Sequence, residues 1–172
     1  LIKNEGIALL ELIKNSYDAD ATECEVNLSY LDSEMLGEIV VEDNGVGMSF
    51  ETIRDVWMQP GNTHKKKQVD EEKKTKLGRL PIGEKGIGRF GIHKLGKEIE
   101  IITRSKGNLE VYFKIDWSKF DSNQFLDEIP ITIEEREPQK FINSTGTRIQ
   151  IRNIEQWNKR KFRETYRQIV SL

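Results

Sequence analysis

The sequence predicts an α+β domain with a largely antiparallel or mixed sheet. Helix-forming segments lie early in the chain, and most strand-forming segments follow one another later, in hairpin-like succession. The chain does not show the alternating strand–helix–strand order that would favour a parallel sheet covered on both faces. Its 172 residues suit one domain and allow burial of roughly 70% of the surface of the unfolded chain.

The first predicted element is a helix over residues 10–20, LELIKNSYDAD. Glu11, Asn15 and Asp18 stand at i, i+4 and i+7, so they fall within roughly 60° of one face. Apolar side chains occupy most of the remaining circumference, and such a helix is normally buried. The polar strip therefore faces an internal pocket or, as charge at helical spacing usually indicates, water. Its Asn, Ser, Tyr and Asp are mediocre helix formers, which favours the pocket.

Alternating apolar residues and short apolar runs predict the strands. The first strand covers residues 24–31, with Val26, Leu28 and Tyr30 on one side. Later strands are predicted at residues 37–42, 98–104, 110–116, 129–135 and 147–152. Ser49 can cap a short helix from residue 50 to about 58, and residues 159–172 are typical of a closing helix.

A long polar segment, residues 59–82, separates the short helix from the glycine-rich sequence that follows. It is rich in lysine, and loops of this length in compact domains are usually functional lids or disordered segments. Because glycines follow at once, we expect a mobile lid over a site. The alternative is a solvated run of charge.

Residues 83–91 read GEKGIGRFG and formally match G-x-G-x-x-G. No strand precedes them, so they do not fit a dinucleotide-binding fingerprint, and the Gly-Lys-Ser/Thr of a Walker A loop is missing. No V-A-I-K strand follows, as it would in a protein kinase. Glycines before a predicted helix over residues 89–95 can bring backbone N–H groups to an anion. We therefore expect this segment to bind phosphate. The alternative is that its glycines form a hinge or allow tight packing.

Residues 42–48, EDNGVGM, bring a strand into Asp43-Asn44-Gly45, with a second glycine at position 47. Asn-Gly strongly favours a turn, and a turn alone would account for the pattern. A carboxylate at a strand end can also accept a hydrogen bond from an exocyclic amine. Residues 144–147, STGT, lead into the last strand, where the Thr147 hydroxyl could join a ligand network.

Composition excludes several classes of function. The net charge of -2 gives no global signal for nucleic acid or membrane binding. Cys24 is the only cysteine, which excludes an internal disulfide and a cysteine-cluster metal site. His64 and His93 are too few for a histidine-rich zinc site. No run approaches the ~18 apolar residues that cross a bilayer, and without a targeting segment we expect a cytoplasmic protein.

In their order and separations, the four motifs together resemble the GHKL superfamily, named for DNA gyrase, the ninety-kilodalton heat-shock chaperone, histidine kinases and MutL. The matching motifs are Glu11-x-x-x-Asn15-x-x-Asp18, DNGVGM from Asp43, the glycine segment 83–91, and Gly146-Thr147. The resemblance covers roughly residues 7–152. It implies the Bergerat fold, a two-layer α/β sandwich with helices on one face of a mixed, mostly antiparallel sheet, and a site for ATP and Mg²⁺.

The resemblance also implies roles for single residues. Asn15 would give an oxygen ligand to Mg²⁺, and Asp43 would accept from the adenine amino group. Thr147 would support Asp43 by hydrogen bonding or through water, and Asp18 would orient neighbouring groups at the pocket wall. Gly47 would make room for the base. The remaining ATP-binding residues implied are Gly45, Met48, Lys85, Gly86, Ile87, Gly88 and Arg89, the glycine segment offering backbone to the phosphates.

Glu11 distinguishes branches of the superfamily. In the chaperone, gyrase and MutL branches this position activates the water that attacks the γ-phosphate, whereas histidine kinases usually lack it. The resemblance is therefore nearest to the Glu-containing chaperone, MutL and MORC-like branch, and it implies an ATPase. The alternatives are a histidine-kinase-like phosphotransferase domain and a nucleotide-binding interaction module without turnover.

The chain opens without Met, almost at the motif helix, and ends on a helix. We therefore expect a single ATP-binding domain over residues 1–172, with residues 153–172 leading towards a downstream domain of the same chain. We expect slow hydrolysis by this domain alone and nucleotide-dependent homodimerisation in the longer protein. The client stays open between protein, as for the chaperone, and DNA, as for MutL and MORC proteins.

Overall fold

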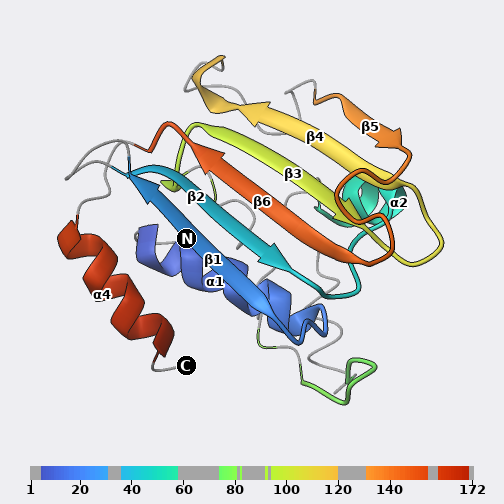
Figure 1. The fold of residues 1–172 in the computed structure, drawn as a ribbon, viewed down its shortest axis with the longest axis horizontal. Coiled ribbons are helices and arrows are strands. Elements are labelled where there is room, and N and C mark those ends of the chain that lie inside the picture. Colours follow the sequence, from blue (N-terminus) through green and yellow to red (C-terminus); the bar gives the residue numbers. More distant parts are fainter. Residues whose placement is uncertain are drawn as a thin grey trace.

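A six-stranded antiparallel sheet, covered on one face by helices, forms the described part of the chain (Figure 1). The structure is a computed structural model that describes residues 5–30, 36–57, 74–80, 82, 92, 94–119, 131–154 and 159–170. The strands are β1 (Cys24–Tyr30), β2 (Leu36–Asp43), β3 (Glu98–Arg104), β4 (Glu110–Asp116), β5 (Ile133–Arg136) and β6 (Gly146–Arg152). The main helices are α1 (Glu5–Asp18), α2 (Phe50–Thr52) and α4 (Lys159–Val170).

The strand order is β1-β2-β6-β3-β4-β5, and all of these neighbours pair antiparallel. The last strand of the chain, β6, is thus inserted between β2 and β3. Its register places Thr147 opposite Asp43 of β2 on one side and opposite Thr103 of β3 on the other. Three segments that lie far apart in the sequence therefore meet at one end of the sheet. The predicted α+β fold is confirmed, with an antiparallel sheet.

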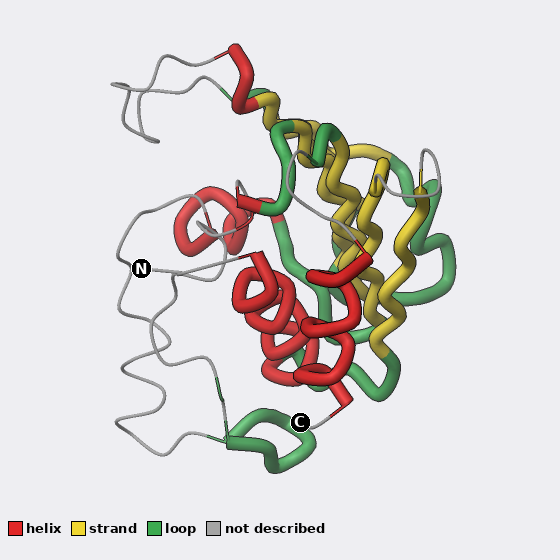
Figure 2. Tube along the Cα trace, turned by 90° about the vertical axis from the view of Figure 1, so that its left-hand side faces the viewer, coloured by secondary structure: helices red, strands yellow, loops and turns green. Residues whose placement is uncertain are grey.

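The core lies between the sheet and α1. Alternate residues of the central strands point to the helical side, which buries Ile39, Ile101 and Ile151 completely. From α1, Ala8, Leu9, Leu12 and Ser16 are buried against this face, as expected for an amphipathic stripe. Figure 2 shows the two layers from the side, with α4 beside α1.

The other face of the sheet carries charged side chains in cross-strand ion pairs, as expected for a solvated face of an antiparallel sheet. Arg148 lies 2.6 Å from Glu42, and Lys114 lies 2.8 Å from Glu100. The alternation of apolar and charged residues along the strands therefore determines which face of the sheet packs against the helices.

Element boundaries follow the predictions closely for most strands. β3 and β4 begin and end where predicted, and β5 is displaced towards the C-terminus. Ser49 caps α2 as predicted, accepting from the amide of Thr52, but the helix continues as a π-helix over Ile53–Trp57. The first helix begins and ends earlier than predicted. It ends before residue 20 because Asp20 turns the chain with a φ of 59°.

The predicted lid and glycine segment are only partly described. Of residues 59–82, the structure describes 74–80 and 82, and the glycine segment 83–91 lies outside the described residues. Of the predicted helix over residues 89–95, Ile92, Lys94 and Leu95 are described; Ile92 and Lys94 belong to a 3-10 turn, and Leu95 lies in the turn that follows. Among the helices that are described, none has the length and apolar character needed to cross a membrane.

Candidate functional site

Asp43 ends β2 and lies almost fully buried, with 9% of its surface exposed. Two donors hold its carboxylate. Ser16 Oγ of α1 donates to Oδ2 at 2.9 Å, and the backbone N–H of Gly45 donates to Oδ1 at 2.9 Å. The first bond joins the motif helix to the strand end, and the second closes the turn that follows. The carboxylate is therefore fixed in direction before any ligand arrives.

Burial raises the pKa of Asp43 above the ordinary value for an aspartate. The Gly45 amide, the Ser16 hydroxyl and the backbone of Thr147 favour the charged form, while the nearby charge of Glu42 disfavours it. Burial outweighs these hydrogen bonds, so the ionised carboxylate is held at a free-energy cost. A further donor, supplied by a ligand, would lower that cost.

A chain of hydroxyls lies beside Asp43. Thr103 is completely buried, and its hydroxyl donates to the carbonyl of Gly146 at 3.0 Å. The same oxygen accepts from the backbone N–H of Met48 at 3.0 Å and lies 3.0 Å from the hydroxyl oxygen of Thr147. A threonine hydroxyl has one proton, so Thr147 is the donor in that pair. The Thr147 oxygen is left with acceptor capacity only.

The turn after Asp43 needs glycine because of its packing. An added Cβ on Gly47 would lie 1.9 Å from the carbonyl oxygen of Arg104, and Gly47 has a φ of +64°. An added Cβ on Gly45 would lie 2.6 Å from the carbonyl oxygen of Ala19. The turn is thus wedged between the end of α1 and the end of β3. The predicted role of Gly47 in admitting a base stays a prediction beside this packing reason.

The polar strip of α1 is half-buried. Glu11 accepts a hydrogen bond from Lys14 Nζ at 3.0 Å, and the two side chains are 23% and 29% exposed. Asp18 Oδ1 accepts from the backbone N–H of Ile82 at 2.8 Å, so Asp18 orients a neighbouring segment. Asn15 lies between them on the same face, directly before the Ser16 that bonds Asp43. The strip is therefore neither core nor fully solvated.

A cavity of about 450 Å³ lies beside the turn. Hydroxyls and two lysines dominate its lining, which comprises Val46, Gly47, Ser49, Thr52, Lys76, Ser105, Lys106, Asn108 and Thr145. It includes Gly47 of the predicted site and Lys76 of the predicted lid. Asp43, Glu11 and Asn15 are not among the residues that line it.

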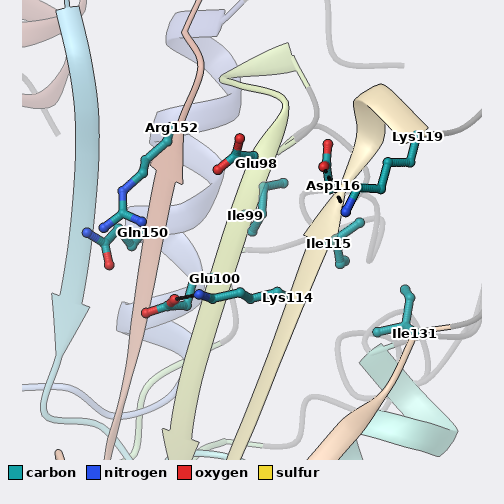
Figure 3. A pocket seen from close by; sticks show the side chains of 10 residues that line it. All are labelled: Glu98, Ile99, Glu100, Lys114, Ile115, Asp116, Lys119, Ile131, Gln150 and Arg152. Carbon is teal, nitrogen blue, oxygen red and sulfur yellow. Dashed lines mark ion pairs between the residues drawn. The ribbon is translucent and has the colours of Figure 1, made fainter.

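A second cavity, also about 450 Å³, lies at the opposite end of the sheet (Figure 3). Its lining includes three carboxylates and three cations, and two ion pairs form among them. Lys114 lies 2.8 Å from Glu100, and Lys119 lies 3.4 Å from Asp116. None of the predicted site residues lines this cavity, so it is separate from the site at Asp43.

Within the described residues, no group of three or more His, Cys, Asp or Glu side chains could hold a metal ion by itself. Mg²⁺ does not need such a group, because it keeps waters and takes oxygen ligands from phosphates. The amide oxygen of Asn15 is a ligand of the kind that this cation accepts. The donor set of α1 therefore fits Mg²⁺ bound together with a phosphate ligand.

The structure brings together Asp43, Gly45, Met48 and Thr147, and it joins them to α1 through Ser16. It does not describe the predicted phosphate contacts Lys85, Gly86, Ile87, Gly88 and Arg89, which lie outside the described residues.

Sequence reasoning missed two hydroxyls of the site, those of Ser16 and Thr103. Thr103 alternates in step with the buried residues Ile99 and Ile101, so it lies on the same inward face of β3. A polar residue at such a position is the signal that could have revealed it. For Ser16, the signal was a small polar residue directly beside the polar strip.

The sequence matches the family model described as "Histidine kinase-, DNA gyrase B-, and HSP90-like ATPase" over residues 4–147. It is also similar to a curated protein of Herpetosiphon aurantiacus named "Putative type II restriction enzyme HgiDII". The identity is 35% over 98 residues, which are 57% of this chain and 14% of that protein. The chain thus corresponds to a small part of the relative's length.

Proposed function

The chain belongs to the histidine kinase-, DNA gyrase B- and HSP90-like ATPase family, and on that premise we propose that it binds ATP with Mg²⁺ and hydrolyses it. One observation carries the proposal. Asp43, in the motif that resembles the family's adenine-binding motif, is a buried carboxylate fixed by Ser16 and Gly45 at the end of β2. A buried, oriented acceptor of this kind suits a ligand that brings its own donor.

The adenine amino group has two N–H donors, and the site offers acceptors. Asp43 accepts hydrogen bonds from Ser16 Oγ and from the backbone amides of Gly45 and Thr147. Its two oxygens have about four acceptor positions, so one position is left for a ligand. The Thr147 hydroxyl gives its proton to Thr103 and keeps acceptor capacity. Asp43 and Thr147 are direct partners across β2 and β6. We assign Asp43 the direct contact with the amine and Thr147 a supporting one.

Asn15 is the residue we assign to Mg²⁺. It stands one helical turn after Glu11 on α1, beside the Ser16 that is bonded to Asp43. The ion, when bound with ATP, neutralises charge on the phosphates. The side chain of Asn15 contributes one oxygen ligand and no charge, which leaves the remaining positions to phosphate oxygens and water.

Glu11 is the residue we assign to the attacking water. Lys14 bonds one of its oxygens, Oε1, which leaves Oε2 to accept a proton from water. The pairing with Lys14 also limits the directions that the carboxylate can take. General-base assistance of this kind typically contributes about 10²–10⁴-fold to a rate. A phosphotransferase would not need Glu11, so its presence favours hydrolysis.

For the whole protein, we propose that ATP turnover drives conformational change or dimerisation in a DNA-processing machine. The support is the name of the relative, a restriction enzyme, of which the matched segment is 14%. A chaperone-like protein client and a binding module without turnover are the competing roles. Phosphate release in the presence and absence of DNA, measured on the longer protein, distinguishes a DNA-stimulated ATPase from both.

The binding proposal is tested by thermal melting with ATP, ADP or no nucleotide, each with Mg²⁺. A ligand that binds only the folded protein stabilises it by RT ln(1 + [L]/Kd). We expect a rise in Tm with both nucleotides. No shift at millimolar nucleotide would refute the proposal.

A further inference from the structure

The helix α4 concentrates positive charge in a chain that is slightly acidic as a whole. Residues 159–170, KRKFRETYRQIV, contain five lysines and arginines and one glutamate, a net charge of +4, whereas the whole chain has a net charge of -2. The net charge of the chain therefore conceals a local basic segment. Such a segment attracts polyanions when its cations share one exposed face.

The packed side of α4 determines which of its side chains face outward. Thr165 is buried, and Phe162 and Ile169 are partly buried against the hydrophobic core. These three residues stand at i, i+3 and i+7, so they occupy one side of the helix. In both views α4 lies beside α1 (Figure 1, Figure 2). The helix is therefore held in one rotation about its axis.

Three arginines form a stripe on the opposite side of α4. Arg160, Arg163 and Arg167 are all exposed, and at about 100° per residue they fall within roughly 60° of one another. At about 1.5 Å per residue they extend over about 10 Å along the helix. We call these three residues the arginine stripe. Arginine suits phosphate because its planar guanidinium keeps its charge and can bond two phosphate oxygens at once.

The charge of the arginine stripe is largely uncompensated. Arg160 Nε lies 3.1 Å from Glu164 Oε1, and the two side chains are 87% and 57% exposed. An ion pair this exposed contributes little, so Arg160 can exchange it for a phosphate. None of the ion pairs among the described residues involves Arg163 or Arg167. The stripe therefore presents cations that the described part of the chain does not neutralise.

An aromatic side chain lies beside the arginine stripe. Tyr166 is 56% exposed, and the centre of its ring lies 6.1 Å from that of Phe162. Because Phe162 belongs to the packed side of α4, this contact limits the directions that the Tyr166 ring can take. Tyrosine hydroxyls and arginines are typical donors to phosphate oxygens in protein–DNA interfaces. The surface thus combines charge with a further donor to phosphate.

We propose that the arginine stripe, with Tyr166 beside it, binds the phosphate backbone of double-stranded DNA. Charge complementarity selects the partner, because an exposed row of arginines can contact a regular line of phosphates without reading the bases. The length of the stripe, about 10 Å, spans about three phosphates of one strand. The choice of DNA among polyanions rests on the proposed DNA-processing role, which the inference deepens by naming the contact surface.

The first experiment measures the affinity of the longer protein for a fluorescent DNA duplex by anisotropy, between about 50 and 200 mM salt. Each phosphate contact contributes about 0.9 to the slope of log K against log[salt]. The double variant Arg163→Gln, Arg167→Gln should therefore lose about 1.8 from that slope and bind roughly 60-fold more weakly at about 0.1 M salt. An unchanged slope would overturn the proposal.

The matched control is the double variant Arg54→Gln, Lys106→Gln. It removes the same charge at exposed positions next to α2 and between β3 and β4, across the sheet from α4 (Figure 1). The control should keep the affinity and the slope of the wild type. An equal loss in both double variants would mean that only the total charge of the protein acts, and the arginine stripe would not be the contact surface.

The second experiment tests for a gain of affinity, which a loss of folding cannot produce. Glu164→Gln removes the partner of Arg160 and the negative charge beside the stripe. One additional phosphate contact should make binding about eightfold tighter at about 0.1 M salt. Glu134→Gln makes the same change at an exposed position of β5 and should bind as the wild type does. Unchanged or weaker binding by Glu164→Gln would contradict the proposal.

The DNA surface and the ATP site can fail separately. If the wild type shows no shift in Tm with Mg²⁺-ATP, the proposed ATP function fails and the DNA titrations still decide the role of α4. If the wild type binds no duplex at about 50 mM salt, the arginine stripe is not a DNA surface, whatever the ATP result. Tighter binding of a single-stranded DNA or of an RNA duplex of the same length would overturn the assignment to double-stranded DNA.

Discussion

Replacing Asp43 by asparagine should separate folding from binding. The amide oxygen can still accept from Gly45, and the amide nitrogen takes the place of Oδ2, 2.9 Å from Ser16 Oγ. The Ser16 hydroxyl can then accept from that nitrogen and turn its own proton to the Leu12 carbonyl, 3.4 Å away. The bonds to Ser16 and Gly45 can thus both be kept, so the fold should tolerate the change.

The stability of Asp43→Asn should depend on pH in a defined direction. Because the folded-state pKa of Asp43 is raised above its ordinary value of 3.8, the wild type loses stability as pH rises from there through the folded-state pKa. The asparagine variant does not carry this loss. Its free energy of unfolding at neutral pH should equal or exceed that of the wild type, and the difference should shrink as the pH is lowered through that window.

Binding should respond in the opposite way. An amide nitrogen presents a donor to the adenine amine, which is itself a donor, and a site left with an unpaired polar group loses about 1–3 kcal/mol. This corresponds to an affinity about 5–150-fold weaker. At 100 Kd, ATP adds about 2.7 kcal/mol of stability, and after a 100-fold loss of affinity it adds about 0.4 kcal/mol. For a domain of this size, the shift in Tm should fall from about 5–11 °C to about 1–2 °C.

The assay is thermal melting with and without millimolar Mg²⁺-ATP. Glu134→Gln is the matched control, because it makes the same carboxylate-to-amide change at an exposed position of β5. The control should keep the full shift caused by ATP. If Asp43→Asn also keeps it, the carboxylate does not contact the base. If Asp43→Asn melts far below the wild type without nucleotide, the account of Ser16 and Gly45 is wrong.

Three further predictions concern other parts of the site and fold. Glu11→Ala should lower the ATPase rate about 10²–10⁴-fold with little change in ATP affinity, while Asn15→Ala should weaken the Mg²⁺-dependent part of binding; a parental rate in Glu11→Ala would rule out the general-base role. Gly47→Ala should destabilise the domain in urea more than Gly107→Ala, because both have positive φ but only Gly47 has a backbone carbonyl where the Cβ would lie. Glu110→Gln should cost about 3 kcal/mol at neutral pH, since Glu110 is fully buried against an arginine and two backbone amides. Burial acts to raise the pKa of Glu110, but those bonds outweigh burial and lower that pKa. The stability that the Glu110 carboxylate contributes is therefore present above its ordinary pKa of 4.5 and is lost as the pH falls below that value. Equal pH dependence of the unfolding free energy in the wild type and in Glu110→Gln would refute this.

Most strands were predictable because half of their residues are buried. The bounds of β3 and β4 agree with the alternation of apolar residues, since a slip by one residue would turn Ile99 and Ile101 of β3 to the solvent. The position of β6 was not predictable in the same way. Hairpin-like succession favours sequential neighbours, whereas β6 pairs with β2 and β3. Its place depends on long-range packing that no local pattern records.

The charged and glycine residues of the site could be named from the sequence, but the neutral hydroxyls could not. Asp43 ends a strand before Asn-Gly and is conspicuous, whereas Ser16 is an ordinary helix residue and Thr103 an ordinary strand residue. Each acquires its role only when α1 packs on the sheet and β6 enters between β2 and β3. Their function is directional, since Ser16 orients the Asp43 carboxylate through Oδ2 and Thr103 accepts the hydroxyl proton of Thr147. The groups proposed to contact ATP therefore derive from the motif, and their orientation derives from the fold.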